Sequence, residues 1–165
     1  MSISDKKVGT FPKEKIMLKE MVHVCVVVKD VEKTAQVLAE KFGIGPFEIR
    51  VKHYPKTKAS MHGEAVEYTL KFGYSKVGLI VLELVETVKG KTMYQEFFEK
   101  HGEGIHHIGF PTPLPFEDEL RKWEKNGIKS IQVSKLDDPE EGWAYMDTQD
   151  LVGFTMEILS FRKYQ

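Results

Sequence analysis

Apolar and polar positions along the chain repeat the same pattern twice. The apolar run at residues 22–28 is typical of a strand, and the apolar positions after it have helical spacing: Val31, Ala35, Leu38 and Phe42. A second apolar run, at residues 105–110, is also followed by helix-spaced positions: Phe116, Leu120 and Trp123. Gly43 and Gly127 follow the two predicted helices, at positions where helices commonly end.

Three strand-like runs follow each predicted helix. In the first half they lie near residues 46–53, 64–72 and 77–85, with an extra loop at residues 54–63. In the second half they lie near residues 129–133, 142–147 and 153–159. Between the halves, Thr92 begins a capping-box sequence that predicts a helix over residues 93–100. The sequence therefore predicts an α+β fold built from two tandem β-α-β-β-β modules.

The two halves also share residues at a constant offset. The segment EKFGI at residues 40–44 matches EKNGI at residues 124–128, an offset of 84 residues, and the same offset relates His23 to His107. It does not relate His23 to the neighbouring His106. Because successive side chains of a strand point to opposite faces, His107 is expected to face a functional cavity and His106 to point away from it.

Each half places one glutamate inside its last apolar strand, Glu83 in LEL and Glu157 in MEI. Burying a lone carboxylate is unfavourable unless a cation or a metal ion compensates its charge. With His23 and His107, these glutamates form a set that suits one divalent ion of Co, Zn, Ni, Mn or Fe. Each residue taken alone is more often a hydrogen-bonded core residue or an exposed edge residue, but the recurrence at equivalent places favours a metal site.

Composition and charge exclude several classes of protein. The net charge of the 165-residue chain is −1, which provides no basic excess for general binding to nucleic acid. The single cysteine, Cys25, excludes an internal disulfide and predicts a reducing, cytoplasmic location. No apolar run approaches the roughly 20 residues that span a bilayer, so no membrane insertion is expected.

The predicted elements also define the organisation of the chain. Residues 1–17 are polar and rich in lysine, which is typical of a flexible tail and not of a signal peptide. The remainder is expected to form one compact domain with three parts: a first module at residues 18–88, a linker helix at 89–104 and a second module at 105–162.

These motifs resemble those of the vicinal oxygen chelate superfamily, which includes glyoxalase, methylmalonyl-CoA epimerase and extradiol dioxygenases. The resemblance covers about residues 20–160 and is closest to the epimerase branch, in the segments LELVE (82–86) and FFEKHGEGIHHIGF (97–110). It implies a half-open barrel around a metal ion held by His23, Glu83, His107 and Glu157. Since relatives are commonly dimers, it also implies a homodimer.

The resemblance also points to a base outside the ligand set. The epimerase uses a glutamate on the third strand of its first module, and Glu67 is the matching residue here. Alternation along this strand supports the match, because the neighbours of Glu67 form a separate apolar face: Val66, Tyr68, Leu70 and Phe72. Glu67 is therefore expected to face the cavity and to form an opposed acid–base pair with Glu157. A solvated glutamate on the outer face is the alternative.

The leading interpretation is a metal-dependent epimerase or isomerase that removes a proton alpha to the carbonyl of a small-molecule substrate, with an acyl-CoA as one candidate. Lys56 and Lys58, in the extra loop, are candidates for contact with an anionic substrate, although a solvated loop is the commoner role for such lysines. A lactoylglutathione-lyase activity of the glyoxalase type is the main alternative. A ring-cleaving dioxygenase is disfavoured because such enzymes usually use two histidines and one carboxylate. A non-enzymatic, resistance-type binding protein would not need the four ligands.

Overall fold

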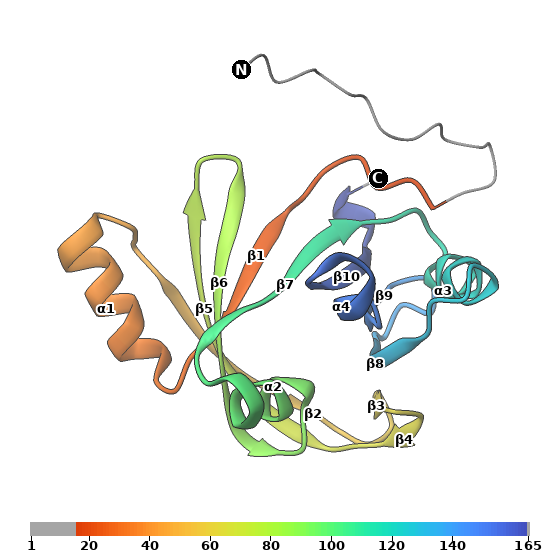
Figure 1. Cartoon of the computed structure of the whole chain (residues 1–165), viewed down its shortest axis with the longest axis horizontal. Helices are drawn as coiled ribbons and strands as arrows, with labels where there is room; N and C mark the ends of the chain where they lie inside the picture. The colour runs from red at the N-terminus through yellow and green to blue at the C-terminus, as the bar shows by residue number, and fades with distance from the viewer. Residues whose placement is uncertain (1–15, 165) are drawn as a thin grey trace, which may run out of the picture.

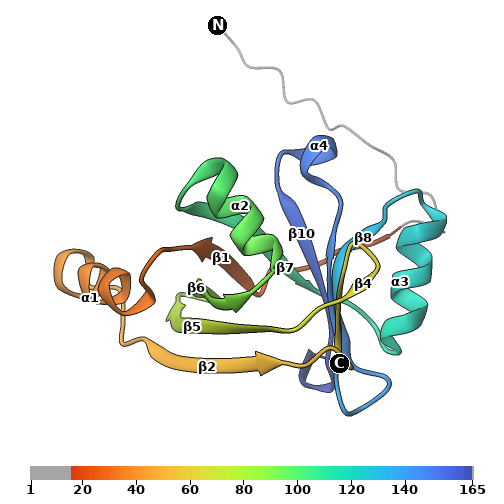
Figure 2. The same ribbon diagram turned by 90° about the horizontal axis from the view of Figure 1, so that it is seen from below.

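The structure is a computed structural model that describes residues 16–164, so residues 1–15 of the expected tail lie outside it. All ten strands belong to one mixed sheet, in the order β2-β5-β6-β1-β7-β10-β9-β8-β3-β4. The sheet curls into a half-barrel, and α1 and α3 lie outside it at opposite ends (Figures 1 and 2). The predicted α+β fold is confirmed.

The first half of the chain contains the expected strand, helix and three further strands, with an extra hairpin described below: β1 (His23–Val27), α1 (Val31–Phe42), β2 (Glu48–Tyr54), β5 (Tyr68–Val77) and β6 (Ile80–Gly90). The helix begins after Asp30, whose carboxylate accepts a hydrogen bond from the Lys33 backbone N–H at 3.0 Å. It ends at Gly43, which has a left-handed φ of 66°. Val31 and Ala35 are buried against the sheet, so the predicted apolar stripe positions this helix.

The second half has the corresponding elements: β7 (Gly104–Pro111), α3 (Phe116–Lys125), β8 (Ser130–Lys135), β9 (Gly142–Met146) and β10 (Thr155–Ser160). α2 (Met93–His101) connects the two halves. Two short helical segments lie near the end of the chain: α4 (Gln149–Val152) and the 3₁₀ turn η1 (Arg162–Tyr164). Phe116 and Trp123 of α3 are buried in one cluster with Ala144, Met146 and Ile158. Within residues 16–164, no helix has the length and apolarity needed to cross a membrane.

The two halves meet at the first strand of each half. β1 pairs antiparallel with β7, β1 pairs parallel with β6, and β7 pairs parallel with β10. The order β6-β1-β7-β10 therefore occupies the middle of the sheet. This order brings together the four strands that carry the residues expected to bind metal: Glu83, His23, His107 and Glu157.

A β-bulge lies at the centre of this arrangement. Cys25 pairs with His107, but the next residue on β1, Val26, pairs with Ile105, which leaves His106 as an extra residue on β7. His106 and His107 are both buried, with 4% and 0% of their surface exposed. Their Nδ1 atoms are only 2.9 Å apart, so the expectation that the two rings point to opposite faces is wrong, because the bulge interrupts the alternation of side chains.

The extra segment of the first half is built differently from the expectation. Residues 59–65 form a hairpin of β3 (Ala59–Met61) and β4 (Glu64–Ala65), and β3 pairs with β8 of the second half. His62 and Gly63 form its turn with positive φ values of 51° and 82°. The strand expected at residues 64–72 is therefore divided, and β5 begins only at Tyr68. Glu67 lies in the connection between β4 and β5 and is exposed.

Candidate metal centre

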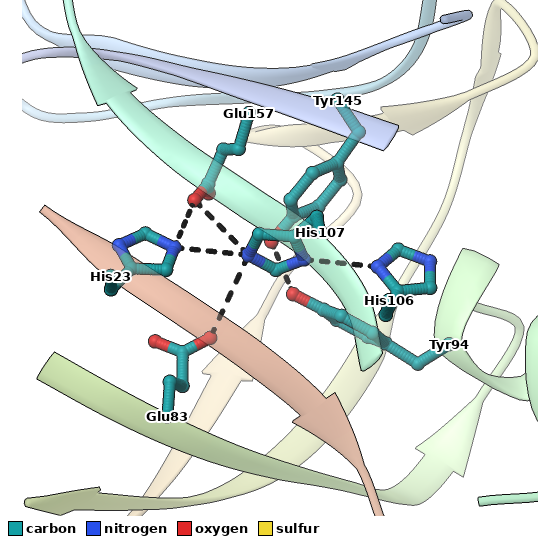
Figure 3. A network of polar contacts seen from close by, with 7 residues as sticks. All are labelled: His23, Glu83, Tyr94, His106, His107, Tyr145 and Glu157. Carbon is teal, nitrogen blue, oxygen red and sulfur yellow. Dashed lines mark hydrogen bonds and ion pairs between the residues drawn. The ribbon is translucent and has the colours of Figure 1, made fainter. Parts of the chain in front are cut away.

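Three side chains from three neighbouring strands converge at the middle of the sheet. The Nε2 atoms of His23 and His107 are 3.0 Å apart, and Glu157 Oε2 lies 2.7 Å from the first and 3.3 Å from the second (Figure 3). All three residues are buried. The two histidines that are related by the offset of 84 residues therefore lie beside the same carboxylate.

Glu83 lies next to this trio. Its Oε1 atom is 4.0 Å from His107 Nε2, farther than Glu157 is. Glu83 pairs in register with Cys25, and Cys25, Glu83 and His107 form a second group whose possible ligand atoms all lie within 4.8 Å of one another. The sequence interpretation did not include Cys25 in the site. Its position two residues after His23, on the same face of a strand, was the signal that could have revealed it.

The donor atoms suit a bound cation. Glu157 Oε2 is buried without a well-aligned hydrogen-bond donor, although two imidazole nitrogens lie close to it. The Nε2 atoms of His23 and His107 are 3.0 Å apart and can share at most one proton. At least one of them therefore directs an unprotonated lone pair toward the other. Ligands bound at about 2.1 Å and at right angles to each other are separated by about 3 Å, which matches this spacing. Residues His23, His107 and Glu157 therefore fit a divalent ion.

His106 contacts His107 on the side away from His23 and Glu157. Its Nδ1 atom lies 2.9 Å from Nδ1 of His107, whose Nε2 faces His23 and Glu157. Figure 3 shows His106 on the far side of His107 from the other donors, and it belongs to neither group of possible ligand atoms. Burial and the neighbouring His107 hold the pKa of His106 well below its usual range, so its ring is neutral. The unprotonated nitrogen of a neutral ring can accept a hydrogen bond from His107 Nδ1–H and so fix the orientation of the His107 ring.

Two tyrosines enclose the same imidazole. The hydroxyl groups of Tyr94 and Tyr145 are hydrogen-bonded to each other, and the ring centre of Tyr145 is 4.7 Å from that of His107. Burial raises the pKa of both phenols well above the usual range, so both remain neutral. These residues were not identified from the sequence, because neither belongs to the repeated pattern of histidine and glutamate.

A cavity of about 340 Å³ opens beside the centre, with His23, Glu83 and Glu157 in its wall. Aromatic side chains form much of the remaining wall: Tyr54, Phe72, Tyr74, Trp143, Tyr145 and Phe161. The cavity therefore offers an apolar surface beside a group of metal-binding side chains.

Glu67 does not line this cavity. The inward face of β5 carries the apolar residues of the strand, since Phe72 and Tyr74 line the cavity while Tyr68 and Leu70 are buried in the adjoining core. Glu67 lies on the opposite parity, before the strand begins, and is exposed. The expectation that Glu67 faces the cavity is wrong, because the apolar face of this strand is the one that faces inward.

The two loop lysines also lie away from the cavity wall. Lys58 is paired with Asp137, and Lys56 is exposed. Neither residue lines the cavity beside His23. The expected contact of these two lysines with an anionic substrate is therefore wrong for this cavity.

Residues 22–146 match the family model of the glyoxalase/bleomycin resistance protein/dioxygenase superfamily. The chain belongs to this superfamily. The match spans most of both halves and includes His23, Glu83 and His107, whereas Glu157 lies beyond it. The superfamily assignment therefore agrees with the curled sheet, while the fourth residue of the expected ligand set rests on the structure and on the internal repeat. Comparison with curated proteins gives no match.

Solved structures of the superfamily fold are similar to the chain at low sequence identity. A Streptomyces coelicolor methylmalonyl-CoA epimerase bound to 2-nitronate-propionyl-CoA has a TM-score of 0.63 and 16% identity, covering 88% of this chain and 96% of the epimerase. A Mycobacterium tuberculosis methylmalonyl-CoA epimerase has a TM-score of 0.60 and 12% identity, covering 89% and 91%. A hypothetical protein of Bacillus halodurans has a TM-score of 0.59 and 17% identity, covering 87% and 94%. These similarities establish the fold.

The pKa values of the two buried carboxylates, Glu83 and Glu157, are shifted in opposite directions. Burial raises the pKa of Glu157, but His107 and His23 outweigh burial and lower it to about 2. Burial lowers the pKa of His23, but the charge and hydrogen bond of Glu157, together with the charge of Glu83, raise it above its usual value. Burial dominates at Glu83, whose pKa is raised although both histidines act against the shift. Glu157 is thus the carboxylate that the imidazoles hold in its charged form.

Proposed function

We propose that the protein is a metal-dependent isomerase that removes a proton alpha to a substrate carbonyl, with epimerisation as its reaction. The observation that carries this proposal is the convergence of His23, His107 and Glu157, with separations of 2.7–3.3 Å between their facing atoms, beside an aromatic cavity whose wall includes His23 and Glu157. Membership of the superfamily supports it, because the superfamily fold recurs in epimerases.

Four residues would hold the metal ion: His23, His107 and Glu157, with Glu83 as the fourth ligand. When bound, a divalent ion polarises a substrate carbonyl and stabilises the negative charge of an enolate. The mixture of imidazole and carboxylate donors suits Co, Zn, Ni, Mn or Fe. His106 would hold the His107 ring in place by its contact with Nδ1, as a hydrogen-bond partner of a metal-bound histidine commonly does.

Side chains of the cavity would supply the remaining functions. Glu157 would accept the alpha proton on one face of the carbon, since its carboxylate reaches the cavity and the imidazoles together, and water from the open side of the cavity would deliver a proton to the other face. The aromatic wall would bind the apolar part of the substrate and exclude water, which strengthens electrostatic interactions at the reacting carbon. Glu67 is exposed and does not line the cavity, which argues against a role for it as the second acid–base group.

An acyl-CoA is the first substrate class to test, since the similar structures include epimerases in complex with acyl-CoA compounds. We also propose that the protein is a homodimer, following the resemblance to the superfamily. A second function, a glyoxalase-type lyase, is favoured by the exposed position of Glu67. Epimerisation needs a proton donor on the face of the carbon opposite to Glu157, which water would have to supply here, whereas a proton shift on one face can use Glu157 alone.

Two measurements test these proposals. Elemental analysis of the purified protein should give about one divalent ion per chain, and its absence would leave the non-enzymatic binding protein as the better interpretation. The metal-loaded protein should then exchange the alpha proton of methylmalonyl-CoA with solvent deuterium, with label appearing in both epimers. Turnover of the hemithioacetal of methylglyoxal and glutathione, without exchange on methylmalonyl-CoA, would instead select the lyase.

A further inference from the structure

The edge strand β2 presents its charged side chains to the cavity. Three of its alternate residues, Glu48, Arg50 and Lys52, line the cavity wall. Residues between them, Ile49 and Val51, are 37% and 61% exposed on the other face. Glu48, Arg50 and Lys52 are exposed as well, so the charged face of β2 forms the open side of the cavity, where its side chains can contact an entering ligand.

Lys52 is the cation of this strand that lacks a carboxylate partner. Arg50 is paired with Glu48, with 2.5 Å between Nη2 and Oε1. Lys52 Nζ instead lies over two ring faces, 5.4 Å from the centre of Phe72 and 5.8 Å from the centre of Tyr74. Among residues 16–164, no carboxylate oxygen lies within ion-pair distance of Lys52. The aromatic contacts hold the ammonium group in the cavity without neutralising it.

A metal ion at the centre would leave this charge uncompensated. The two carboxylates of the cavity wall nearest the histidines, Glu83 and Glu157, carry two negative charges when ionised. A divalent ion bound by them balances both charges. Lys52 then faces a neutral centre. A bound anion would restore the balance of charge in this space.

We propose that the cavity selects small acids, in which an anionic group pairs with Lys52 while separate oxygen atoms of the same molecule bind the metal ion. This inference rests on the proposed function, since it needs a metal ion at the centre. The aromatic rings of Phe72 and Tyr74 carry Lys52 on one side and would contact the apolar part of the acid on the other. The cavity volume of about 340 Å³ limits the part of the ligand that it encloses to a small molecule.

Two hydroxamic acids test the inference with the Co(II)-loaded protein. Acetohydroxamic acid offers only the chelating group, whereas succinic acid monohydroxamate adds a carboxylate, and both are measured through the visible spectrum of Co(II). In the native protein the carboxylate-bearing compound should bind more tightly. Lys52→Gln should weaken its binding by about 10- to 100-fold, as expected for a charge-assisted contact, and should change acetohydroxamate binding by less than about threefold.

A matched control and distinct failures complete the experiment. Lys56→Gln removes an exposed lysine outside the cavity wall and should leave both affinities unchanged. Equal effects of Lys52→Gln on the two compounds, or no effect on either, would overturn recognition of the acid by Lys52. If the native protein takes up no Co(II), or if neither hydroxamate changes the Co(II) spectrum, the proposed metal-dependent function fails and the inference fails with it.

Discussion

Gly109 lies directly opposite His23 in the antiparallel pair of β1 and β7, and the His23 ring occupies the space where a side chain at position 109 would lie. A Cβ atom built on Gly109 would be 2.2 Å from His23 Cε1 and 2.6 Å from Nε2. The glycine therefore permits the imidazole to reach His107 and Glu157.

Gly109→Ala should displace the His23 ring and weaken metal binding by at least about 10-fold, because a contact this short forces the imidazole to move. Gly104→Ala is the matched control on the same strand. Its added methyl group would meet only Phe97 at ordinary contact distance, 3.7 Å, so metal affinity should be retained. Titration of both variants with Co(II) measures the difference, and equal affinities would contradict the proposed role of His23.

His107→Ala should abolish stoichiometric metal binding, whereas His106→Ala should lower metal affinity by about 10- to 100-fold and leave the stoichiometry unchanged. The first variant removes a ligand atom, and the second removes only the partner of His107 Nδ1. His106→Asn, which can still form a hydrogen bond, should recover part of the affinity. Isothermal titration of the metal-free proteins provides the comparison. Full metal affinity in His106→Ala would show that the contact between the two rings does not position His107.

Glu67→Gln should change the rate of alpha-proton exchange by less than about twofold, because Glu67 is exposed outside the cavity. Glu157→Gln should slow exchange by about 10²–10⁴-fold, the usual contribution of an acid–base group. Exchange should be measured at saturating metal, so that weaker metal binding by Glu157→Gln does not determine the result. A loss of 100-fold or more in Glu67→Gln would contradict the placement of that residue.

Removal of the metal ion should lower the stability of the fold. A ligand that binds only the folded state stabilises it by about 3–4 kcal/mol when its free concentration is 100- to 1,000-fold above Kd. Thermal unfolding with Co(II), and then after dialysis against a chelator, should reveal a decrease in Tm that Co(II) reverses. His107→Ala should show no such decrease. An unchanged Tm in the native protein would indicate that no metal binds at micromolar concentration.

Recognition of the acid by Lys52 should be lost in alkaline solution, at a lower pH than for an ordinary lysine. Burial lowers the pKa of Lys52 below 10.5, and Arg50 and Lys163 lower it further, while Glu83 and Glu157 raise it. Lys52 carries its charge below its pKa in the folded protein, so the preference for the carboxylate-bearing hydroxamate should fall as the pH rises through that value. The ratio of the two hydroxamate affinities cancels changes at the metal. In Lys52→Gln the ratio should be independent of pH.

Much of the fold and the centre could be predicted from the repeat. The same offset that relates His23 to His107 also relates the strands that carry them, and parallel pairing of β6 and β10 with these strands brings in Glu83 and Glu157. These parallel strand pairs are expected from the order of strands and helices along the chain. That order can be identified from the spacing of apolar residues in the sequence.

Two local features could not be predicted from periodicity. The bulge at His106 depends on how β7 pairs with β1, and a pattern within one strand contains no information about its partner. The second feature is the inward face of β5. Because the cavity is lined with aromatic residues, the apolar face of this strand points inward, and the usual assignment of polar residues to the functional face was wrong for Glu67.

The β3–β4 hairpin belongs to the first half by sequence and to the second half by pairing. From the strand beside it, the buried Gln132 donates a hydrogen bond to the Tyr68 hydroxyl at 2.9 Å and accepts one from the Met93 backbone N–H at 3.2 Å. A fragment ending before β7 would therefore carry a hairpin without its partner, and the complementary fragment would expose the edge of β8. Because each half completes the pairing of the other, unfolding of either half should unfold both.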